Sequence, residues 1–391
     1  MPTPIASLHE LSTPCIVIER RRLEANLVRM QTRAASQGAV LRPHTKTHKT
    51  VAIARRQQEL GAQGLTVAKV GEAEVYVEAG FDDIFLAYPV VGPRKHERLA
   101  ALSPQARITF GIDTLEAAHR ASAIYTEHGQ PARVLIEIDT GGNRCGRRWD
   151  DATLPAFAQA VAALPGLAVA GIFTHEGHAY GGPTGEESQA SALRRVMEEA
   201  RNRMLRVAAR LCGAGLPRKD FVISIGSTPS MTVFENREFE GFRITEIRPG
   251  NYVFHDRTQV ALGVTTLQDC ALTVLSTVVS KHRDTLGAER LFLDAGSKVL
   301  TSDRVSGAEG YGCLLYNAAT MVEHPHVRLA ALSEEHGWAR VRGGATYVVG
   351  DRVRVVPNHA CVVVNTQDEV FLVDGQQVVA RWPVDTRGRV R

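Results

Sequence analysis

Eight short apolar runs alternate with helix-like stretches through the first two thirds of the chain, and this alternation constrains the fold more than any other feature. Eight strand–helix alternations in about 250 residues favour an α/β fold of the (β/α)8 TIM barrel type. A doubly wound open sheet is the competing arrangement, and the count and the length both favour the barrel. The runs predicted to be strands are Leu41–Lys46, Gly64–Val70, Asp83–Pro89, Ala106–Asp113, Ala132–Asp139, Leu167–His175, Phe221–Ser227 and Thr245–Gly250.

Between these runs we expect helices at Thr50–Gly61 and Gly71–Gly80, and a longer helix after Gly181. Thr184 and Glu187 have the spacing of a capping box at its start. Apolar residues then recur at steps of three and four, which predicts a long amphipathic helix. They are Leu193, Val196, Met197, Ala200, Met204, Val207, Ala208 and Leu211.

The chain changes character after about residue 255. The stretches LTVLSTVVSK, RLFLDAG, TYVVGDRVRVVP, CVVVNT and EVFLVDGQQVVARW are rich in valine and separated by turn residues, as strands are. Asp374-Gly375 is a strong hairpin signal between the last two strands. We therefore predict a barrel domain over residues 21–255 and a β-domain over 256–391.

Composition excludes several classes of protein. The net charge is only +4 and no block of five Lys or Arg residues occurs, so no nucleic-acid partner is expected. The chain contains no run of 18 apolar residues, so no transmembrane helix is expected. The N-terminal stretch lacks the basic and apolar regions of a secretory signal, and the six cysteines are scattered. These features predict reduced thiols in a cytoplasmic protein.

Polar segments follow the predicted barrel strands where catalytic residues of this fold lie, at the C-terminal ends. They read LRPHTKTHK, DTGGNRCGR, THEGHAY, IGSTPS and RPGNYVFHD. The last two follow strands 7 and 8, the usual phosphate site of a TIM barrel. Backbone N–H groups and hydroxyls there could cradle a phosphate dianion, although two turns and a helix cap would give the same pattern. The residues concerned are Gly226, Ser227, Thr228, Gly250 and Asn251.

The first strand carries Arg42, His44, Lys46 and His48 at a period of two, which places them on one face. Lys49 has the opposite parity and would point away. A lysine desolvated at the top of a barrel strand has a lowered pKa and can form a Schiff base. The alternative is a surface lysine flanked by histidines.

His359 and Cys361, in VVPNHACVVV, would share one face of a strand in the β-domain. Imidazole and thiolate together prefer zinc. Two ligands are fewer than the usual three of a catalytic zinc site. A buried cysteine beside a hydrogen-bonded histidine is the alternative interpretation.

Together these motifs resemble the metal-activated D-serine dehydratase and D-threonine aldolase family, which belongs to the alanine-racemase-like, fold-type III class of pyridoxal phosphate enzymes. The resemblance runs from about Thr13 to Asn365. It rests on RPHTKTHKT, TVAKVGEAEV, DTGGNRCG, GHAY, GSTPS, IRPGNYVF, LSEEHG and PNHAC, in this order. It implies a barrel followed by a β-domain, with residues 1 to about 20 joining the β-domain.

The resemblance also implies roles for individual residues. Lys46 would hold pyridoxal 5'-phosphate and act as the base on the substrate Cα, and Arg144 would hydrogen-bond the phenolic oxygen of the cofactor. His178 and Tyr180 would lie beside the cofactor ring. The phosphate would be bound by Gly226, Ser227, Thr228, Gly250 and Asn251.

Further roles concern the ring nitrogen and the metal. Arg248 matches the arginine near the pyridine nitrogen in alanine racemases, and Tyr252 is a rival for that contact. His359 and Cys361 would hold zinc. Glu335 and His336 lie in a family motif to which no role can be assigned.

The implied reaction is the dehydration of D-serine to pyruvate and ammonia, with zinc assisting the loss of the β-hydroxyl. D-threonine aldolase chemistry is the main rival, but those enzymes tend to have an aspartate in place of Cys361, which suits Mn²⁺. Dehydration or aldol cleavage of a 3-hydroxy-D-aspartate is another rival activity. A cofactor carrier would lack the β-domain, a racemase gives no reason for a His–Cys pair, and a binding module explains neither Lys46 nor the phosphate loops. By analogy, the enzyme would be a homodimer acting on a small D-amino acid.

Overall fold

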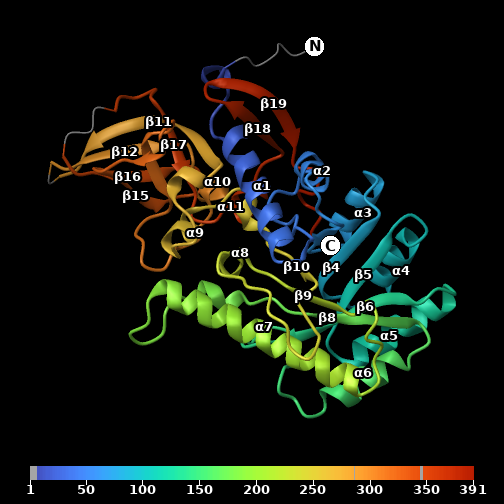
Figure 1. Cartoon of the computed structure of the whole chain (residues 1–391). Helices are drawn as coiled ribbons and strands as arrows, with labels where there is room; N and C mark the ends of the chain where they lie inside the picture. Colours follow the sequence, from blue (N-terminus) through green and yellow to red (C-terminus); the bar gives the residue numbers. More distant parts are fainter. Residues whose placement is uncertain (1–6, 286, 344–346) are drawn as a thin grey trace. The chain divides into compact units, whose positions relative to one another are not determined.

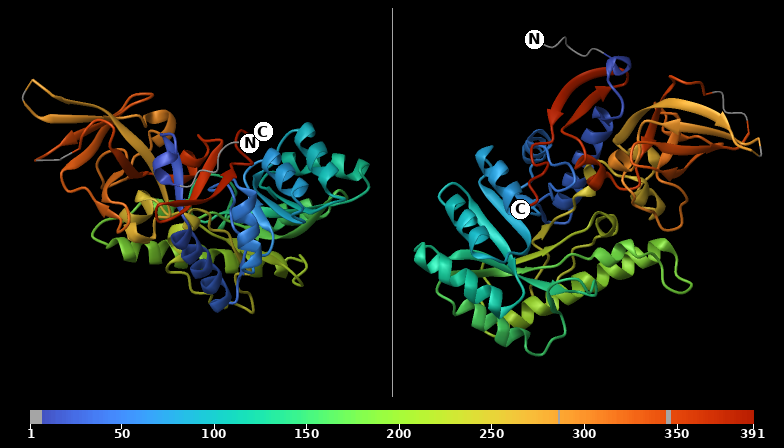
Figure 2. Two further views of the ribbon diagram at one scale, coloured as in Figure 1. Left: turned by 90° about the horizontal axis from the view of Figure 1, so that it is seen from above. Right: turned by 180° about the vertical axis from the view of Figure 1, so that it is seen from behind.

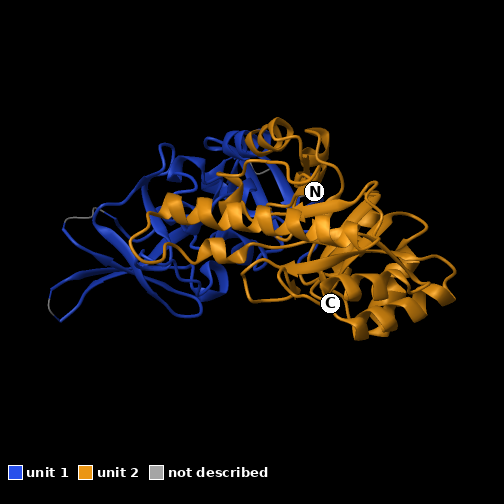
Figure 3. Ribbon diagram, turned by 60° about the horizontal axis from the view of Figure 1, so that its bottom comes forward, with its two compact units in different colours: residues 1–28, 47–52, 251–387 blue, residues 29–46, 53–250, 388–391 orange. Residues whose placement is uncertain are grey.

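The computed structural model describes residues 7–285, 287–343 and 347–391. The chain divides into two compact units, each made of segments that are distant in sequence (Figure 3). The barrel unit comprises residues 29–46, 53–250 and 388–391. The β unit comprises residues 1–28, 47–52 and 251–387.

Eight parallel strands form the wall of the barrel unit within the described residues. Their order is β2-β10-β9-β8-β6-β5-β4-β3, and a parallel bridge between His44 and Thr66 joins the two ends of this sheet. The N–H of Thr66 donates to the carbonyl of Pro43, and the N–H of Thr45 donates to the carbonyl of Thr66, both at 2.9 Å. The predicted (β/α)8 barrel is therefore confirmed, and its strands are β2 (Val40–Leu41), β3 (Leu65–Val67), β4 (Asp83–Pro89), β5 (Arg107–Ile112), β6 (Ala132–Asp139), β8 (Leu167–Phe173), β9 (Val222–Ile225) and β10 (Glu246–Ile247), with β7 (Arg147–Arg148) beside β6.

Helices cover the outer side of these strands, as Figures 1 and 2 show for α4, α5 and α6. α5 and α6 pack against β8, and α3 packs against β4. The helices of this part of the chain are α1 (Arg20–Ser36), α2 (Val51–Glu59), α3 (Val70–Glu78), α4 (Pro93–Leu102), α5 (Leu115–Glu127), α6 (Leu154–Ala162), α7 (Gln189–Gly213) and α8 (Thr228–Met231).

The long helix α7 was predicted correctly, but its start was not. All eight residues of the apolar pattern are buried, because this stripe faces the rest of the barrel unit. Ser188 is the N-cap, and its hydroxyl accepts the N–H of Ser191 at 3.2 Å. Thr184 and Glu187 do hydrogen-bond to each other, but they do so in the loop that precedes the helix. The capping-box spacing therefore identified a real local contact that lies outside the helix.

An apolar layer crosses the middle of the barrel and separates its two ends. Phe85, Leu135 and Phe173 form this layer, and the two phenyl rings meet edge to face with centroids 5.0 Å apart. The neighbouring strand contributes Gly111, where an added Cβ would lie 2.7 Å from the Phe173 ring. A glycine is needed there because the aromatic side chain occupies the space.

The β unit is built on a sheet whose main path runs β14-β13-β17-β11-β1-β18-β19, with β12, β16 and β15 continuing from β11. The N-terminal strand β1 (Cys15–Glu19) pairs antiparallel with β11 and parallel with β18. The other strands are β11 (Leu272–Arg283), β12 (Glu289–Leu293), β13 (Cys313–Asn317), β14 (Val322–Glu323), β15 (Val327–Leu332), β16 (Gly337–Val341), β17 (Arg352–Val356), β18 (Glu369–Asp374) and β19 (Gln377–Pro383).

The hairpin prediction in the β unit is confirmed. β18 and β19 pair antiparallel and are joined by Gly375 and Gln376, with Gly375 in the left-handed region at φ +64°. The short helices of the unit are α9 (Arg257–Ala261), α10 (Ser297–Leu300) and α11 (Ala360–Val364). In the described part of the chain, no helix is long and apolar enough to cross a membrane.

One predicted strand of the β unit is wrong. CVVVNT was expected to be a strand, but its first residues form the helix α11. β17 ends at Val356, and the N–H of Ala360 donates to the side chain of Asp256 at 2.9 Å. This contact from a distant segment satisfies a backbone donor in the first turn, so tertiary structure overrides the β-propensity of three valines.

Candidate active site

A cavity of roughly 470 Å³ opens at the C-terminal ends of the barrel strands, where TIM barrels place their active sites. Its size suits a small-molecule cofactor or substrate. Six of its lining residues are cationic or can become so through a histidine ring, and two are carboxylates at the ends of β5 and β6. The lining comprises His44, Lys46, Ala68, Lys69, Ala87, Tyr88, Pro89, Asp113, Glu137, Arg144, Cys145, His175 and Arg248.

Lys46 lies half-buried in the lining of this cavity, as the sequence predicted. β2 ends at Leu41, so the lysine sits on an irregular segment that follows the bridge between His44 and Thr66. Its backbone N–H approaches Nδ1 of His44 at 3.4 Å. The period-two argument extended the strand too far, because these residues leave the sheet.

The cluster predicted around Lys46 is therefore smaller than expected. Arg42 points into a second cavity nearer the N-terminal ends of the strands. His48 belongs to the β unit, where its buried Nδ1 lies 3.2 Å from both the N–H and the hydroxyl of Thr50. Of the neighbours predicted for Lys46, His44 is the one that shares its cavity.

The loop DTGGNRCG that follows β6 presents Arg144 to the cavity. Oδ1 of Asp139 accepts the N–H groups of Gly141 at 2.8 Å and Asn143 at 3.1 Å, which folds the loop back over its own strand. Arg144 lies 3.8 Å from Oε1 of Glu137. This guanidinium is more than half exposed, so a ligand can reach it.

Glu137 is a cavity residue that the sequence analysis missed. It is 2% exposed, and its Oε2 has no hydrogen-bond partner among the described residues. Burial raises its pKa to about 7, although the nearby Arg144 opposes the shift. Perturbed carboxyl groups of this kind are common in active sites. The available signal was an acid between two isoleucines of the apolar strand VLIEID, on the inward parity.

His175 lines the cavity, whereas the histidine predicted to do so does not. Nδ1 of His175 is 3.0 Å from the carbonyl of Gly226. Burial and the positive charge of Lys46 lower its pKa to about 3, so the ring is neutral near pH 7. His178 and Tyr180 instead lie in a 3₁₀ turn, Gly177–Tyr180, and neither belongs to the cavity lining. The His178 ring nitrogens are buried, without partners in the residues that the structure describes.

The loop after β9 is held by Glu176, a second residue that the sequence analysis missed. Its carboxylate accepts the N–H of Gly226 at 3.1 Å and the hydroxyl of Ser230 at 2.6 Å. Ser230 in turn lies 2.9 Å from the hydroxyl of Ser227, the N-cap of α8. The N–H of Gly226 is therefore directed at Glu176 in this structure, whereas the sequence analysis directed it at a phosphate.

Two features of the phosphate-loop prediction can be traced in the structure. Gly226 has φ +153°, and an added Cβ would lie 2.5 Å from the backbone nitrogen of Arg248, so only glycine allows the ends of β9 and β10 to approach. Thr228 is the first residue of α8. Gly250 is the last residue of the barrel segment, and Asn251 and Tyr252 begin the next segment of the β unit.

Arg248 is buried and lines the same cavity. Its Nε donates to the hydroxyl of Ser224 at 2.6 Å, and its Nη2 donates to the carbonyl of Thr174. The guanidinium lies 5.4 Å from the centroids of both phenyl rings of the apolar layer. Burial lowers its pKa, while Glu246, Glu176 and Glu137 oppose the shift.

His359 and Cys361 come together in the β unit at the start of a helix, whereas a strand was predicted. His359 is the N-cap of α11. Its Nδ1 lies 3.2 Å from Oδ2 of Asp256, which also accepts from Nδ2 of Asn251 at 2.6 Å. The hydroxyl of Thr47 lies 3.1 Å from Sγ of Cys361. Asp256 was missed because nothing in RPGNYVFHD distinguishes this carboxylate from an ordinary helix cap.

The electrostatics of this pair favour a thiolate. Burial alone would raise the pKa of Cys361, but the charge of His359 and hydrogen bonds from His359 and Thr47 lower it below the ordinary thiol value. Cys361, followed by Asp256, raises the pKa of His359. A histidine oriented by a carboxylate beside a thiolate is the donor set that zinc prefers. Across the described ranges, no group of three or more His, Cys, Asp or Glu side chains is arranged to hold a metal ion.

The motif LSEEHG has a structural explanation. Its residues turn the chain between β15 and β16, and the N–H of Ser333 donates to the carbonyl of His336 at 2.9 Å. Glu335 forms an ion pair with Lys298 at 2.5 Å, with both side chains exposed. An added Cβ at Gly296 would lie 2.5 Å from the His336 nitrogen, so this turn packs closely against the loop before α10.

Comparison with known protein families matches both parts of the chain. The model of the alanine racemase N-terminal domain matches residues 18–258, and the model of a putative serine dehydratase domain matches residues 271–373. These two stretches account for most of the chain. The resemblance inferred from the motifs is therefore confirmed.

Curated relatives cover nearly the full length. D-threo-3-hydroxyaspartate dehydratase of Delftia sp. (strain HT23) is 35% identical over 366 residues, covering 91% of this chain and 92% of the relative. D-threonine aldolase of Arthrobacter sp. is 32% identical and covers 97% and 94%. D-serine dehydratase of Dictyostelium discoideum is 27% identical and covers 91% of each.

Solved structures agree with the sequence relatives. A D-threo-3-hydroxyaspartate dehydratase with a cysteine-to-alanine substitution, described as the metal-free form, superposes with a TM-score of 0.86 at 32% identity, covering 96% of this chain and 98% of that one. Together, these matches show that the chain belongs to the D-serine dehydratase and D-threonine aldolase family of alanine-racemase-like, fold-type III enzymes, which are pyridoxal-phosphate-dependent lyases acting on D-β-hydroxy amino acids.

Proposed function

We propose that this enzyme is a zinc-dependent dehydratase, which removes the β-hydroxyl of a D-β-hydroxy amino acid and releases a 2-oxo acid and ammonia. D-Serine is the proposed substrate, with pyruvate as the product. The observation that carries the proposal is the pair of Cys361 and His359, with a thiolate stabilised by the imidazole and by Thr47. Thiolate favours zinc over harder ions such as Mn²⁺, which oxygen ligands select.

The residues of the barrel cavity fit pyridoxal 5'-phosphate. When bound, this cofactor supplies the electron sink for reactions at Cα. Lys46 would hold it covalently and then take the proton from the substrate Cα. Arg144, which is exposed to the cavity, would donate to the phenolic oxygen. His175 lines the same cavity, and its neutral ring would contact the cofactor without adding charge.

Polar groups at the ends of β9 and β10 would bind the phosphate. Ser227 and Thr228 at the start of α8, with Gly226 and the backbone of Gly250 and Asn251, are the proposed cradle. Arg248 would face the ring nitrogen, because its guanidinium is fixed by Ser224 and Thr174 on the wall of the cavity. Tyr252 remains the rival for this contact.

The metal site fits the loss of hydroxide. A zinc ion on His359 and Cys361 would act as a Lewis acid on the leaving oxygen. Two protein ligands leave positions for the β-hydroxyl and carboxylate of a substrate. Asp256 holds the imidazole by its other nitrogen, as carboxylates commonly do for zinc-bound histidines. The related dehydratase described as metal-free supports a metal in this family.

A second substrate is favoured by the cations of the cavity. A 3-hydroxy-D-aspartate carries an additional carboxylate, which Lys69 or Arg144 could pair with. The 35% identity to a D-threo-3-hydroxyaspartate dehydratase points in the same direction. We also propose that the enzyme is a cytoplasmic homodimer that takes a small D-amino acid and binds neither nucleic acid nor membrane.

Product analysis with D-serine, D-threonine and 3-hydroxy-D-aspartate tests the reaction. Dehydration of D-serine releases pyruvate and ammonia, and the hydroxyaspartate gives the corresponding dicarboxylic 2-oxo acid. Glycine together with an aldehyde would instead identify aldol cleavage and contradict the proposal. The same assays with Lys46→Ala identify any background reaction.

A further inference from the structure

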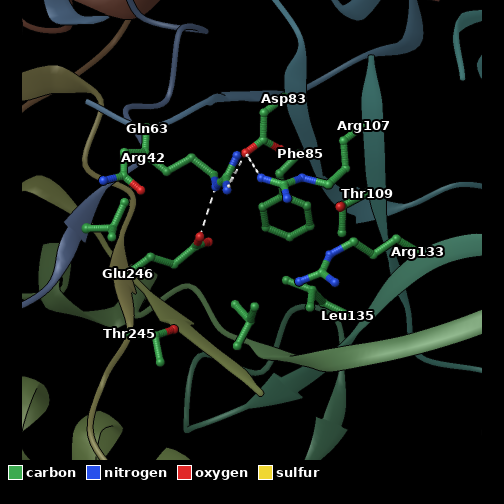
Figure 4. Close-up of a pocket in the computed structure, with 12 residues that line it drawn as sticks. Arg42, Gln63, Asp83, Phe85, Arg107, Thr109, Arg133, Leu135, Thr245 and Glu246 are labelled. Atoms are coloured by element: carbon green, nitrogen blue, oxygen red, sulfur yellow. Dashed lines mark hydrogen bonds and ion pairs between the residues drawn. The ribbon is translucent and has the colours of Figure 1, made fainter. Parts of the chain in front are cut away.

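A second cavity lies inside the barrel at the N-terminal ends of the strands, on the other side of the apolar layer from Lys46. It encloses roughly 200 Å³, and its walls carry charged side chains from β4, β5, β6 and β10 (Figure 4). Phe85 and Leu135 of the apolar layer line it, whereas the first cavity begins one inward position later, with Ala87 and Glu137. The two cavities are therefore separate sites.

Two carboxylates and two arginines of this cavity are paired with one another. Arg42 donates from Nε to Glu246 at 2.9 Å and from Nη2 to Asp83 at 3.0 Å. Arg107 donates to the same oxygen of Asp83 at 2.6 Å. Glu246 also accepts the hydroxyl of Ser224 at 2.6 Å. Each carboxylate is therefore paired with at least one arginine, and burial of the pairs costs less than burial of isolated charges would.

Arg133 has no such partner. It extends from β6 into the cavity (Figure 4), and its guanidinium makes no hydrogen bond or ion pair with any residue that the structure describes. The residue is half-buried, and burial together with the charge of Arg107 lowers its pKa, while Asp83 and Glu246 oppose the shift. Nη1 of Arg42 is also buried, with no hydrogen-bond partner in the described part of the chain. The cavity therefore holds three guanidinium groups against two carboxylates.

We propose that this cavity binds a small oxyanion, namely inorganic phosphate or a small carboxylate, with Arg133 as its principal ligand. A guanidinium offers a planar fork of donors that matches both groups, and the two carboxylates of this cavity are hydrogen-bonded to Arg42 and Arg107, with no hydrogen bond to Arg133 among the described residues. Arg107, at the more exposed rim, adds a second positive charge. The volume lies below the range of drug-sized pockets, so it accepts an ion of this size and excludes a nucleotide.

A structural alternative is that the charged groups simply close the bottom of the barrel. That role accounts for Arg42, Asp83, Arg107 and Glu246, since each of them is paired. It does not account for Arg133, because an unpaired half-buried charge costs stability and contributes no closure. An anion that binds Arg133 would remove this cost, and it would stabilise the folded state in proportion to its concentration.

Calorimetric titration of the cofactor-loaded enzyme tests the proposal, with inorganic phosphate in one arm and pyruvate in the other at matched ionic strength. The wild type should bind at least one of them, and the two arms distinguish phosphate from carboxylate. Arg133→Gln should weaken that binding about tenfold or more, because a charge-assisted hydrogen bond is lost. Arg120→Gln is the control, because it removes the same charge from an exposed pair with Glu116 on α5.

Two results would overturn the proposal. One is the absence of binding in the wild type. The other is equal binding by the wild type and Arg133→Gln, which would locate the anion elsewhere, for example at the cofactor phosphate loops. If Arg133→Gln does not fold, Arg133→Lys is the deciding variant, because lysine keeps the positive charge but lacks the planar fork of donors. Undiminished affinity of Arg133→Lys for the anion would again exclude Arg133 as a bidentate ligand. Binding is measured without turnover, so a failure of the proposed dehydration would leave this result unaffected.

Discussion

At the scale of single residues, Lys46 is the lining residue of the barrel cavity on which the proposed reaction depends most. Its half-buried position beside Arg144, His175 and Arg248 gives it several cationic or neutral neighbours, with Asp113 and Glu137 as the acids. Lys46 is therefore placed where its amine could reach a ligand in the cavity, as the proposed covalent attachment requires.

Replacing Lys46 with alanine should remove the visible absorbance of bound cofactor and lower turnover by about 10³-fold or more, since both the attachment point and the base are lost. Absorbance spectra and initial rates of purified protein measure the two effects. Lys219→Ala, on the exposed surface, is the matched control and should retain both. An unchanged spectrum in Lys46→Ala would show that another residue holds the cofactor.

Glu137 predicts a pH dependence of stability in the cofactor-free protein. Its folded-state pKa of about 7 lies above the ordinary value of 4.5, so folding favours the protonated carboxyl. The stabilising contribution is complete below about pH 4.5 and is lost as the pH rises through about 7, and it amounts to roughly 3 kcal/mol at most. Glu137→Gln keeps a neutral side chain and should remove this dependence.

Urea unfolding of the wild type and of Glu137→Gln at pH 5 and pH 8 measures the difference. Relative to the variant, the wild type should lose unfolding free energy between these two values. Parallel behaviour of the two proteins would mean that Glu137 is ionised throughout and fully compensated by Arg144.

At the scale of elements, the apolar layer determines how the barrel strands can pack. Gly111 on β5 leaves room for the Phe173 ring of β8, and the ring in turn packs against Phe85 of β4. The packing of three barrel strands, β4, β5 and β8, therefore depends on the absence of a side chain at Gly111. Arg248 stacks over the same two rings, which couples the layer to the floor of the cofactor cavity.

Gly111→Ala should destabilise the protein by about 1–3 kcal/mol, because the new Cβ meets the Phe173 ring and tightly packed backbone. Gly213→Ala at the end of α7 is the control, since nothing lies within 4 Å of its added Cβ. That substitution should be neutral or stabilising by up to about 1 kcal/mol. Equal stability of both variants in denaturant titrations would show that the barrel can relax around the added methyl group.

At the scale of the whole molecule, the proposed chemistry divides between the two units. The residues that line the cofactor cavity all belong to the barrel unit, and His359 and Cys361, with Thr47, Asn251 and Asp256 around them, all belong to the β unit. Metal binding and cofactor binding would therefore depend on largely different side chains, although Asn251 belongs to both the proposed phosphate cradle and the group around His359 and Cys361. They should be separable by experiment.

Chelation should lower turnover at least 100-fold while the cofactor absorbance persists, and added Zn²⁺ should restore activity. Metal analysis, spectra and rates on the same samples measure the three quantities. Cys361→Ala should reproduce the loss of metal without loss of cofactor, and Cys212→Ala, at a half-buried thiol on α7, should retain both. Full activity of verified metal-free protein would exclude the metal from the reaction.

The sequence by itself determined most of the secondary structure and several of the reactive side chains. The eight barrel strands, the periodic face of α7 and the β18–β19 hairpin follow from local patterns of apolar and turn residues. Lys46, His359 and Cys361 stood out because polar residues at a strand end and a His-x-Cys pair are visible without a structure, whereas Arg144 and Arg248 were identified through the resemblance to a known family. Those signals are local, so no tertiary information was needed to find them.

Only the tertiary structure decided which other side chains hold these reactive groups in place. Asp256 and His359 are 103 residues apart, and Glu176 reaches Gly226 across 50 residues. His175 lines the cavity, whereas His178 lies in a 3₁₀ turn and is not part of the lining. The pKa values of Glu137, His175 and Cys361 arise from burial and from neighbours that the fold brings together. Burial and long-range pairing depend on the assembled core, and no local pattern of residues encodes them.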